Sequence, residues 1–286
     1  MTKAKKHYLS NKELLKEIHN SKMSYCWLEE PPEEPKRYYY FDLIIDDISE
    51  INDQTIAEAK QNHATRLQKA AHEVEVNRWE RGLTGKKTKP RGVDFAVDPA
   101  SIALEKIVFR LMTFDHVPEE DRKKNPKTIA DRHTKCNFPP FKHVAYVNGE
   151  WTEVGRSHWQ GGLSNGHFST EHGQTTNRLA SMYMELCRRY SMRSNWRGYT
   201  YVDEMRSQAL LQLTQIGLQF NEAKSQNPFA YYTATLSNSF TRVLNLEKRN
   251  QNIRDDLLEQ NGLDPSFTRT FSGEWEAIQE RQAKDT

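Results

Sequence analysis

The stretch NPFAYYTATLSNSFTRVLNLEKR, residues 227–249, has two distinct faces when it is placed on a helix. Asn227 is a good N-cap and Pro228 suits the first helical position, so a helix is predicted to begin there. Apolar residues then recur at spacings of three and four, which predicts a face that packs inward. This face comprises Phe229, Tyr232, Leu236, Phe240 and Val243.

The opposite face of this helix contains no aliphatic residue and no acidic residue. It comprises Tyr231, Thr235, Asn238, Arg242, Asn245 and Arg249. Amide and guanidinium groups read base edges or hold phosphates, and tyrosine rings stack on unpaired bases. Because a solvated face usually mixes Glu with Lys, this pattern favours contact with nucleic acid. Tyr232 and Phe240 are predicted to pack in the core.

Two further helices are predicted before this one. The first runs from about Thr176 to Met192, and the second is expected to be capped by Thr200. Their predicted core residues are Leu179, Met182, Tyr183, Leu186 and Tyr190 in the first, and Val202, Met205, Ala209, Leu213 and Ile216 in the second. Asp203, Glu204 and Gln208 fall on the other flank of the second helix, near its exposed start.

Charge is distributed unevenly along the 286 residues, although the net charge is only +2. Residues 174–254 contain eleven basic and five acidic side chains, whereas residues 255–286 contain three basic and eight acidic ones. A basic block before an acidic tail is typical of a polyanion-binding domain with a tail that masks it or meets a protein. Apolar runs are too short to span a bilayer, so no membrane partner is expected. The three cysteines share no CxxC spacing, which excludes a disulfide framework.

The N-terminal half predicts a mixture of elements. Ser10 and Glu13 indicate a helix N-terminus, with Leu14, Leu15 and Ile18 on its apolar side and an end near Asn20. The proline-rich segment 29–36 is expected to be an extended linker. Helices are predicted at 53–81, with Gly82 as the stop, and at 99–113. Asn148-Gly149 between alternating apolar residues predicts a β-hairpin.

Taken together, the ordered motifs resemble region two of bacterial sigma factors. The similarity is closer to the late-transcription sigma factors of T-even-like bacteriophages, including their relatives in phages of cyanobacteria. It covers roughly residues 7–22 and 174–258. The motifs are His7-Tyr8 with Asn11-Lys12-Glu13-Leu14-Leu15, Gly198-Tyr199-Thr200 with Glu204-Met205, Ile216-Gly217-Leu218 with Phe220, Asn227-Pro228 through Ala234, and Arg242 with Arg249.

This resemblance implies a mainly α protein: a sigma region-two-like helical bundle with a large mixed insertion that contains a β-hairpin. Residues 1–24 would belong with the sigma core at 174–258, residues 25–173 would be an insertion of unknown role, and 259–286 an acidic tail. No cofactor and no catalytic residue are implied. The expected location is the cytoplasm of an infected bacterial host.

Partners and roles also follow from the resemblance. Asp203, Glu204 and Gln208 would dock on the clamp helices of the largest subunit of host core RNA polymerase. Promoter DNA with an A·T-rich −10-like element would be bound by Tyr231, Tyr232, Thr235, Asn238, Arg242, Lys248, Arg249 and Arg254. Tyr231 is the better candidate of the two tyrosines for capturing a flipped base of the melted non-template strand, because Tyr232 leans inward.

The family lacks a domain for the −35 element and depends on a phage co-activator and a sliding clamp. Only 36 residues follow Asn250, too few for such a domain. Phe271, Trp275 and Ile278 are the candidates for clamp binding, and an amphipathic helix is the alternative interpretation of the same residues.

A second class of function is an HNH-like metal-dependent nuclease. His133, Cys136, His143, His158, His167 and His172 lie within forty residues. Their spacing fits no closed zinc pattern, so no metal ligand is predicted. The basic loop with Lys86, Lys87, Lys89 and Arg91 either contacts DNA or polymerase or is merely solvated. A third possibility is a DNA-binding regulator that never contacts polymerase.

Overall fold

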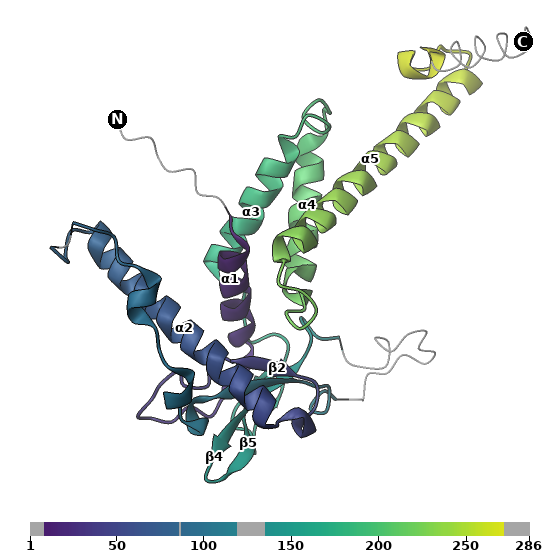
Figure 1. Cartoon of the computed structure of the whole chain (residues 1–286). Helices are drawn as coiled ribbons and strands as arrows, with labels where there is room; N and C mark the ends of the chain where they lie inside the picture. Colours follow the sequence, from purple (N-terminus) through teal and green to yellow (C-terminus); the bar gives the residue numbers. More distant parts are fainter. Residues whose placement is uncertain (1–8, 86, 119–134, 272–286) are drawn as a thin grey trace, which may run out of the picture. The chain divides into compact units, whose positions relative to one another are not determined.

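The computed structural model describes residues 9–85, 87–118 and 135–271. Its chain divides into two compact units. The sheet unit comprises residues 1–180 and 218–228, and the helical unit comprises residues 181–217 and 229–286. Helices predominate over strands in the described residues, as predicted, but the strands form far more than one hairpin (Figure 1).

The sheet unit is built on a five-stranded mixed sheet of order β1-β5-β4-β3-β2. These strands are β1 (Cys26–Leu28), β2 (Leu43–Ile45), β3 (Val108–Met112), β4 (Phe141–Val147) and β5 (Glu150–Ser157). Only β2 and β3 are parallel, which requires a crossover between them. The crossover contains α2 (Asp53–Glu80). A separate two-stranded ribbon pairs β6 (Trp159–Gln160) with β7 (His167–Phe168).

The predicted hairpin is confirmed as β4 and β5. Asn148 and Gly149 form the turn with φ angles of 53° and 93°. Positive φ at both central residues matches the right-handed twist of the two strands, and Asn and Gly adopt it at low cost. The hairpin therefore lies at the centre of the sheet order, with β1 and β3 added on its two sides.

The predicted helix at 99–113 is wrong. Short 3₁₀ turns occupy Pro99–Ser101 and Leu104–Lys106, and the strand β3 follows. Val108, Phe109 and Arg110 are all buried, since β3 is interior to the sheet and covered on both faces. A short, continuous apolar run of this kind has no helical or alternating period, so periodicity alone does not distinguish a buried strand from a helix.

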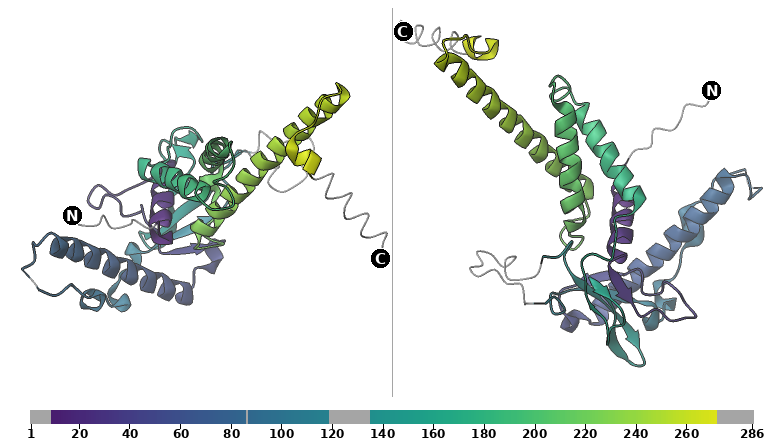
Figure 2. Two further views of the ribbon diagram at one scale, coloured as in Figure 1. Left: turned by 90° about the horizontal axis from the view of Figure 1, so that it is seen from above. Right: turned by 180° about the vertical axis from the view of Figure 1, so that it is seen from behind.

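The predicted helix at 53–81 is confirmed as α2, which Gly82 terminates with a φ of 72°. Asn52 caps its N-terminus by accepting hydrogen bonds from the Gln54 and Thr55 amides. Ala59 and Ala64 pack against the face of the sheet that carries Phe109 (Figure 1). Leu67 and Val74 are 43% and 60% exposed, because α2 extends past the sheet core (Figure 2).

The opposite face of the sheet is covered by α1 (Asn11–Met23) and by residues 29–41. Ser10 caps α1 as predicted, and Leu14 and Ile18 are fully buried. The helix continues three residues past the expected end at Asn20. It groups with the sheet unit, in which His19 lies 3.3 Å from Arg110 of the segment predicted to be an insertion. Lys22 donates to the Phe220 carbonyl and pairs with Glu222 at 2.6 Å, and both partners lie within residues 174–258, with which this helix was predicted to belong.

The predicted extended linker at 29–36 is also wrong, since this segment forms consecutive turns. The Glu34 amide donates to the Pro31 carbonyl at 3.1 Å. The Glu30 carboxylate accepts a hydrogen bond from the Tyr38 amide at 3.0 Å and closes the loop. Proline fixes φ near the value that such turns need, so the same residues suit either structure.

Within the described part of the chain, no helix combines the length and the apolar character needed to cross a membrane.

Candidate nucleic-acid interface

The long helices of the helical unit in the described residues are α3 (Asn177–Ser191, which the unit shares from Ser181 onward), α4 (Val202–Ile216) and α5 (Pro228–Gln260, shared from Phe229). The predicted start of α5 at Pro228 is confirmed. Figures 1 and 2 show α3 and α4 side by side, with the second half of α5 extending away from both.

The inward face of α5 packs on aromatic rings from α3 and the turn after it. Tyr232, Leu236, Phe240 and Val243 are at most 5% exposed, as predicted. The Phe240 ring meets Tyr190 edge to face, with ring centroids 5.0 Å apart, and meets Trp196 at 5.3 Å. Edge-to-face pairs favour a fixed geometry because they oppose the positive edge of one ring to the negative face of another. Phe229 is 40% exposed, so its predicted inward position was wrong.

Tyr232 is a core residue with a bonded hydroxyl group. Its hydroxyl donates to the Gly217 carbonyl at 2.9 Å and lies 3.2 Å from the Tyr183 hydroxyl. Burial raises the pKa of the Tyr183 phenol to about 12, so it stays protonated and available as a donor. The core packing predicted for Tyr232 is confirmed, and a direct contact with DNA would require this pair to separate.

Tyr231 lies at the border of the core. Its side chain is half-buried, its hydroxyl donates to the Ile216 carbonyl at 3.2 Å, and burial raises the pKa of its phenol. The hydroxyl is therefore held while part of the ring remains accessible. An anchored ring with an open face suits stacking, because little side-chain entropy is lost when a base arrives.

Thr235 was predicted on the polar face, but it is only 7% exposed. Its hydroxyl donates back to the Tyr231 carbonyl one turn earlier, at 3.1 Å. Ser239, one turn later, is equally buried, so the covered arc of α5 is wider than its apolar stripe. The expectation that Thr235 faces outward is therefore corrected.

The remaining members of the polar face are exposed. They are Asn238, Arg242, Asn245 and Arg249, and Lys248 and Arg254 are exposed beside them. None of the four basic side chains forms an ion pair with a residue that the structure describes. The first acidic residue of α5 is Glu247, so the whole packed part of the helix carries no negative side chain. Spacings of four, three and four align these groups along one side of α5.

The N-terminus of α4 presents two exposed carboxylates, Asp203 and Glu204, while Gln208 is half-buried. Asp203 pairs with Arg206 at 3.0 Å. The predicted cap at Thr200 is wrong: Tyr201 is the N-cap, and it makes no side-chain capping bond. The first helical hydrogen bond runs from the Met205 amide to the Tyr201 carbonyl, because residues 199–202 already form a turn.

Two exposed cations that the sequence interpretation did not select lie in the turn between α3 and α4. Arg193 stacks on the Tyr190 ring at 4.3 Å, and Arg197 is exposed one helical turn later. Both lie in a turn, where no helical period applies, so the sequence pattern could not have identified them.

The chain folds back after α5. The Asp255 carboxylate accepts hydrogen bonds from the Ser266 amide and hydroxyl at 2.9 and 2.8 Å, and Arg269 pairs with Asp256 and Glu259. Residues 267–271 are helical, and Phe271 is 49% exposed. Trp275 and Ile278, the other two candidates for clamp binding, lie outside the described residues.

Among the residues that the structure describes, the histidines and cysteines considered for metal binding form no ligand group, since no three His, Cys, Asp or Glu side chains are placed to hold a metal ion. His143 and His158 are fully buried, and burial lowers the pKa of each imidazole to about 3. Burial also raises the pKa of the Cys136 thiol to about 11. His133 and Lys86 lie outside the described ranges, and Lys87, Lys89 and Arg91 are exposed.

Comparison with known proteins gives no relative. No model of a protein family, no curated protein and no solved structure matches this chain.

Proposed function

We propose that the chain is a promoter-specificity subunit of the sigma type, which binds bacterial core RNA polymerase and directs it to A·T-rich −10-like late promoters. The observation that carries the proposal is the exposed, acid-free side of α5 with Asn238, Arg242 and Asn245. Its partner would be the melted non-template strand, whose bases and phosphates are both accessible to such side chains.

The geometry supports different DNA-binding roles for successive parts of α5. The half-buried Tyr231 ring lies at the beginning of the helix, where a flipped base would stack. The amides and Arg242 follow over about the next four turns, and Lys248, Arg249 and Arg254 would neutralise phosphates beyond them. Tyr232 and Thr235 support this surface from behind, through the Gly217 carbonyl and the Tyr231 carbonyl, and do not contact DNA themselves.

The polymerase-binding surface would be the exposed start of α4, with Asp203 and Glu204. Two carboxylates beside each other attract a basic surface, and such charges mainly set the rate and orientation of association. The phage co-activator and the sliding clamp remain further proposed partners, the latter through the tail that includes Phe271.

The test is run-off transcription and a pull-down with core polymerase, using purified full-length chain. Arg242→Ala should weaken promoter complexes about tenfold and leave polymerase association unchanged. Glu204→Lys should have the opposite effect. Arg188→Ala is the matched control, because Arg188 is equally exposed but pairs with Glu185 on α3. Equal loss of both activities in Arg242→Ala would contradict the assignment of the two surfaces.

Absence of polymerase from the pull-down, with promoter binding retained, would favour a DNA-binding regulator instead. Cleavage of plasmid DNA by the purified chain would favour the nuclease.

A further inference from the structure

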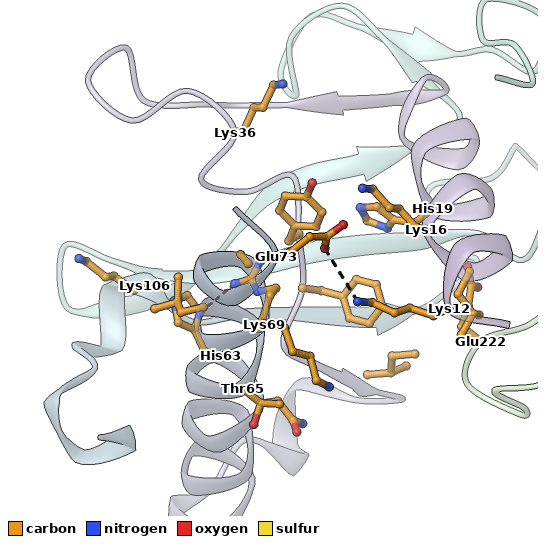
Figure 3. Close-up of a pocket in the computed structure, with 18 of the residues that line it drawn as sticks. Lys12, Lys16, His19, Lys36, His63, Thr65, Lys69, Glu73, Lys106 and Glu222 are labelled. Carbon is orange, nitrogen blue, oxygen red and sulfur yellow. Dashed lines mark hydrogen bonds and ion pairs between the residues drawn. The ribbon is translucent and has the colours of Figure 1, made fainter. Parts of the chain in front are cut away.

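The sheet unit contains a cleft of about 810 Å³ beside the edge strand β2, with α1 on one side and α2 on the other (Figure 3). This volume is in the range of small-molecule sites. Its apolar floor is formed by Leu15, Phe41, Ile44, Leu67 and Ala70. None of these residues was selected from the sequence as functional.

Basic side chains outnumber acidic ones around this cleft by seven to three. Arg66 is neutralised by Asp42 at 2.9 Å, Arg37 lies 3.7 Å from Glu34, and Lys12 reaches Glu73 across the cleft at 3.9 Å (Figure 3). The four other cations form no ion pair with any residue in the described ranges. They are Lys16, Lys36, Lys69 and Lys106.

These four lysines come from four separate segments of the sheet unit: α1, the 29–41 loop, α2 and the 3₁₀ turn before β3. Lys36 has a φ of 74°, which is uncommon for a residue with a side chain. Like charges that line one cleft from separate segments repel one another, and a bound anion would relieve this repulsion. The excess of unpaired lysines around the cleft therefore points to a negatively charged ligand.

A further positive charge lies behind the floor. Arg110 is 1% exposed and stacks between Phe41 and Phe141, with its guanidinium carbon 3.9 and 3.8 Å from the two ring centroids. Burial lowers the pKa of Arg110 to about 10, so it stays charged at neutral pH. Glu222 is ion-paired with Lys22 at 2.6 Å and balances only one of these two buried cations.

The polar groups that line the cleft beside its apolar floor indicate which class of negatively charged ligand it suits. Asn62, Gln226 and Thr65 line the cleft. The Asn62 amide nitrogen donates to the Asp42 carbonyl and the Thr65 hydroxyl to the Gln61 carbonyl, so their oxygens remain as acceptors. The Tyr40 ring contacts both the His19 ring and the Arg66 guanidinium. Amides and hydroxyls bond to the edges of a base, an apolar floor accepts its faces, and lysines hold phosphates. An acidic peptide would use the lysines but would leave the apolar floor open to water.

We infer that this cleft binds nucleoside phosphates, either as a free nucleotide or as part of a single strand. The inference does not rest on the proposed function, since every residue that carries it belongs to the sheet unit. It gives the segment 25–173, whose role the sequence left open, a ligand of its own.

The test measures binding of a fluorescent methylanthraniloyl-ADP and of a labelled short oligothymidylate to the full chain. The double variant Lys16→Glu/Lys69→Glu reverses two exposed charges on opposite sides of the cleft and should fold normally. It should weaken binding of the nucleotide or strand at least about tenfold and reduce the salt dependence of strand binding by about one to two charges. The matched control Lys135→Glu, exposed and outside the cleft, should change affinity less than about twofold.

Saturation by the nucleotide alone identifies a free nucleotide as the ligand, and cleft-dependent binding of the strand alone identifies a single strand. Arg242→Ala should leave nucleotide binding unchanged, which separates this site from the α5 surface. The inference is overturned if neither probe binds, if the double variant binds both as well as the unaltered chain does, or if poly-glutamate displaces the strand as efficiently as unlabelled strand does.

Discussion

The interior of the sheet unit holds charged and titratable side chains, whereas the interior of the helical unit holds aromatic rings and hydroxyl groups. Arg110, Lys22 and His143 are almost fully buried in the first, and Tyr183, Tyr232 and Phe240 in the second. All eight histidines that the structure describes fall in the sheet unit. We therefore expect the stability of the sheet unit to depend mainly on its buried charges. The stability of the helical unit should depend mainly on how closely its buried side chains fit together.

His143 illustrates the sensitivity of the sheet unit. Its Nδ1 donates to the Tyr38 carbonyl at 2.8 Å, so its Nε2 is the acceptor of the bond from Arg110 at 3.1 Å. Protonation would place a second N–H against the Arg110 guanidinium. The folded state thus holds this imidazole in one neutral tautomer.

The largest expected effect comes from acid. Burial lowers the pKa of His143 and of His158 to about 3 and that of His116 to about 4, against about 6.5 in an unfolded chain. The unfolded state therefore binds more protons between these values, and stability is lost as the pH falls below about 6.5. Hydrogen exchange at pH 7 and pH 5, corrected for intrinsic rates, should show loss of protection in β3 and β4 while α3 and α5 keep theirs. Equal loss of protection in both units would contradict the expected difference between them.

The second largest effect is expected when one buried charge is removed. Burial opposes ionisation of Glu222, but the attraction of Lys22 and Arg110 outweighs it and lowers the pKa of the carboxyl. Glu222→Gln leaves both cations without a buried carboxylate, which should cost the sheet unit about 3–5 kcal/mol. Native-state hydrogen exchange gives this free energy for each unit separately.

Glu153→Gln is the control for that variant. Glu153 pairs with Arg156 and Lys142, and its side chain is 24% exposed, so its loss should cost clearly less than that of Glu222. If the two variants cost the same, buried charge is not what distinguishes the sheet unit.

A change of shape should affect the helical unit. A β-carbon at Gly217 would meet the ring and hydroxyl of Tyr183, which is 1% exposed and cannot move aside. Gly217→Ala should therefore destabilise α3, α4 and α5 by about 1–3 kcal/mol. Gly198→Ala, where no atom lies within 4 Å of the added carbon, should change stability by less than about 0.5 kcal/mol. Near-ultraviolet circular dichroism during urea unfolding would compare the two variants.

The smallest effect should follow loss of one hydroxyl. Tyr232→Phe keeps the ring but removes the bonds to the Gly217 carbonyl and to the Tyr183 hydroxyl. We expect a cost of about 1 kcal/mol in the same urea experiment. A cost near zero would mean that ring packing alone holds the helical unit together.

The helical unit could be predicted from the sequence because its signals are local. Pro228 marks the start of α5, and apolar spacings of three and four identified the buried residues from Tyr232 to Val243. The position of Thr235 could not be predicted, since a helical period gives the direction of a face but not how far a neighbouring helix covers it.

The parts of the sheet unit that the sequence did not predict depend on distant partners. β3 is buried on both faces, so it lacks the alternation that identifies a half-exposed strand. Arg110 is placed opposite His143 by the register of β3 and β4, which no local pattern specifies. The lysines of the cleft are separated by up to 90 residues along the chain, and singly each resembles an ordinary surface residue.

The second half of α5 has a consequence for handling the protein. Leu246, Ile253 and Leu257 are about half exposed. In the described residues beyond Val243, the main tertiary contacts of this helix are the hydrogen bonds from Ser266 to the Asp255 carboxylate. A helical segment with so little packing opens often, and Lys248, Arg249 and Arg254 make it a substrate for trypsin. Limited digestion with trypsin should cleave the chain first in this segment. A macromolecule that covers the segment should slow this cleavage, so the cleavage rate reports its binding.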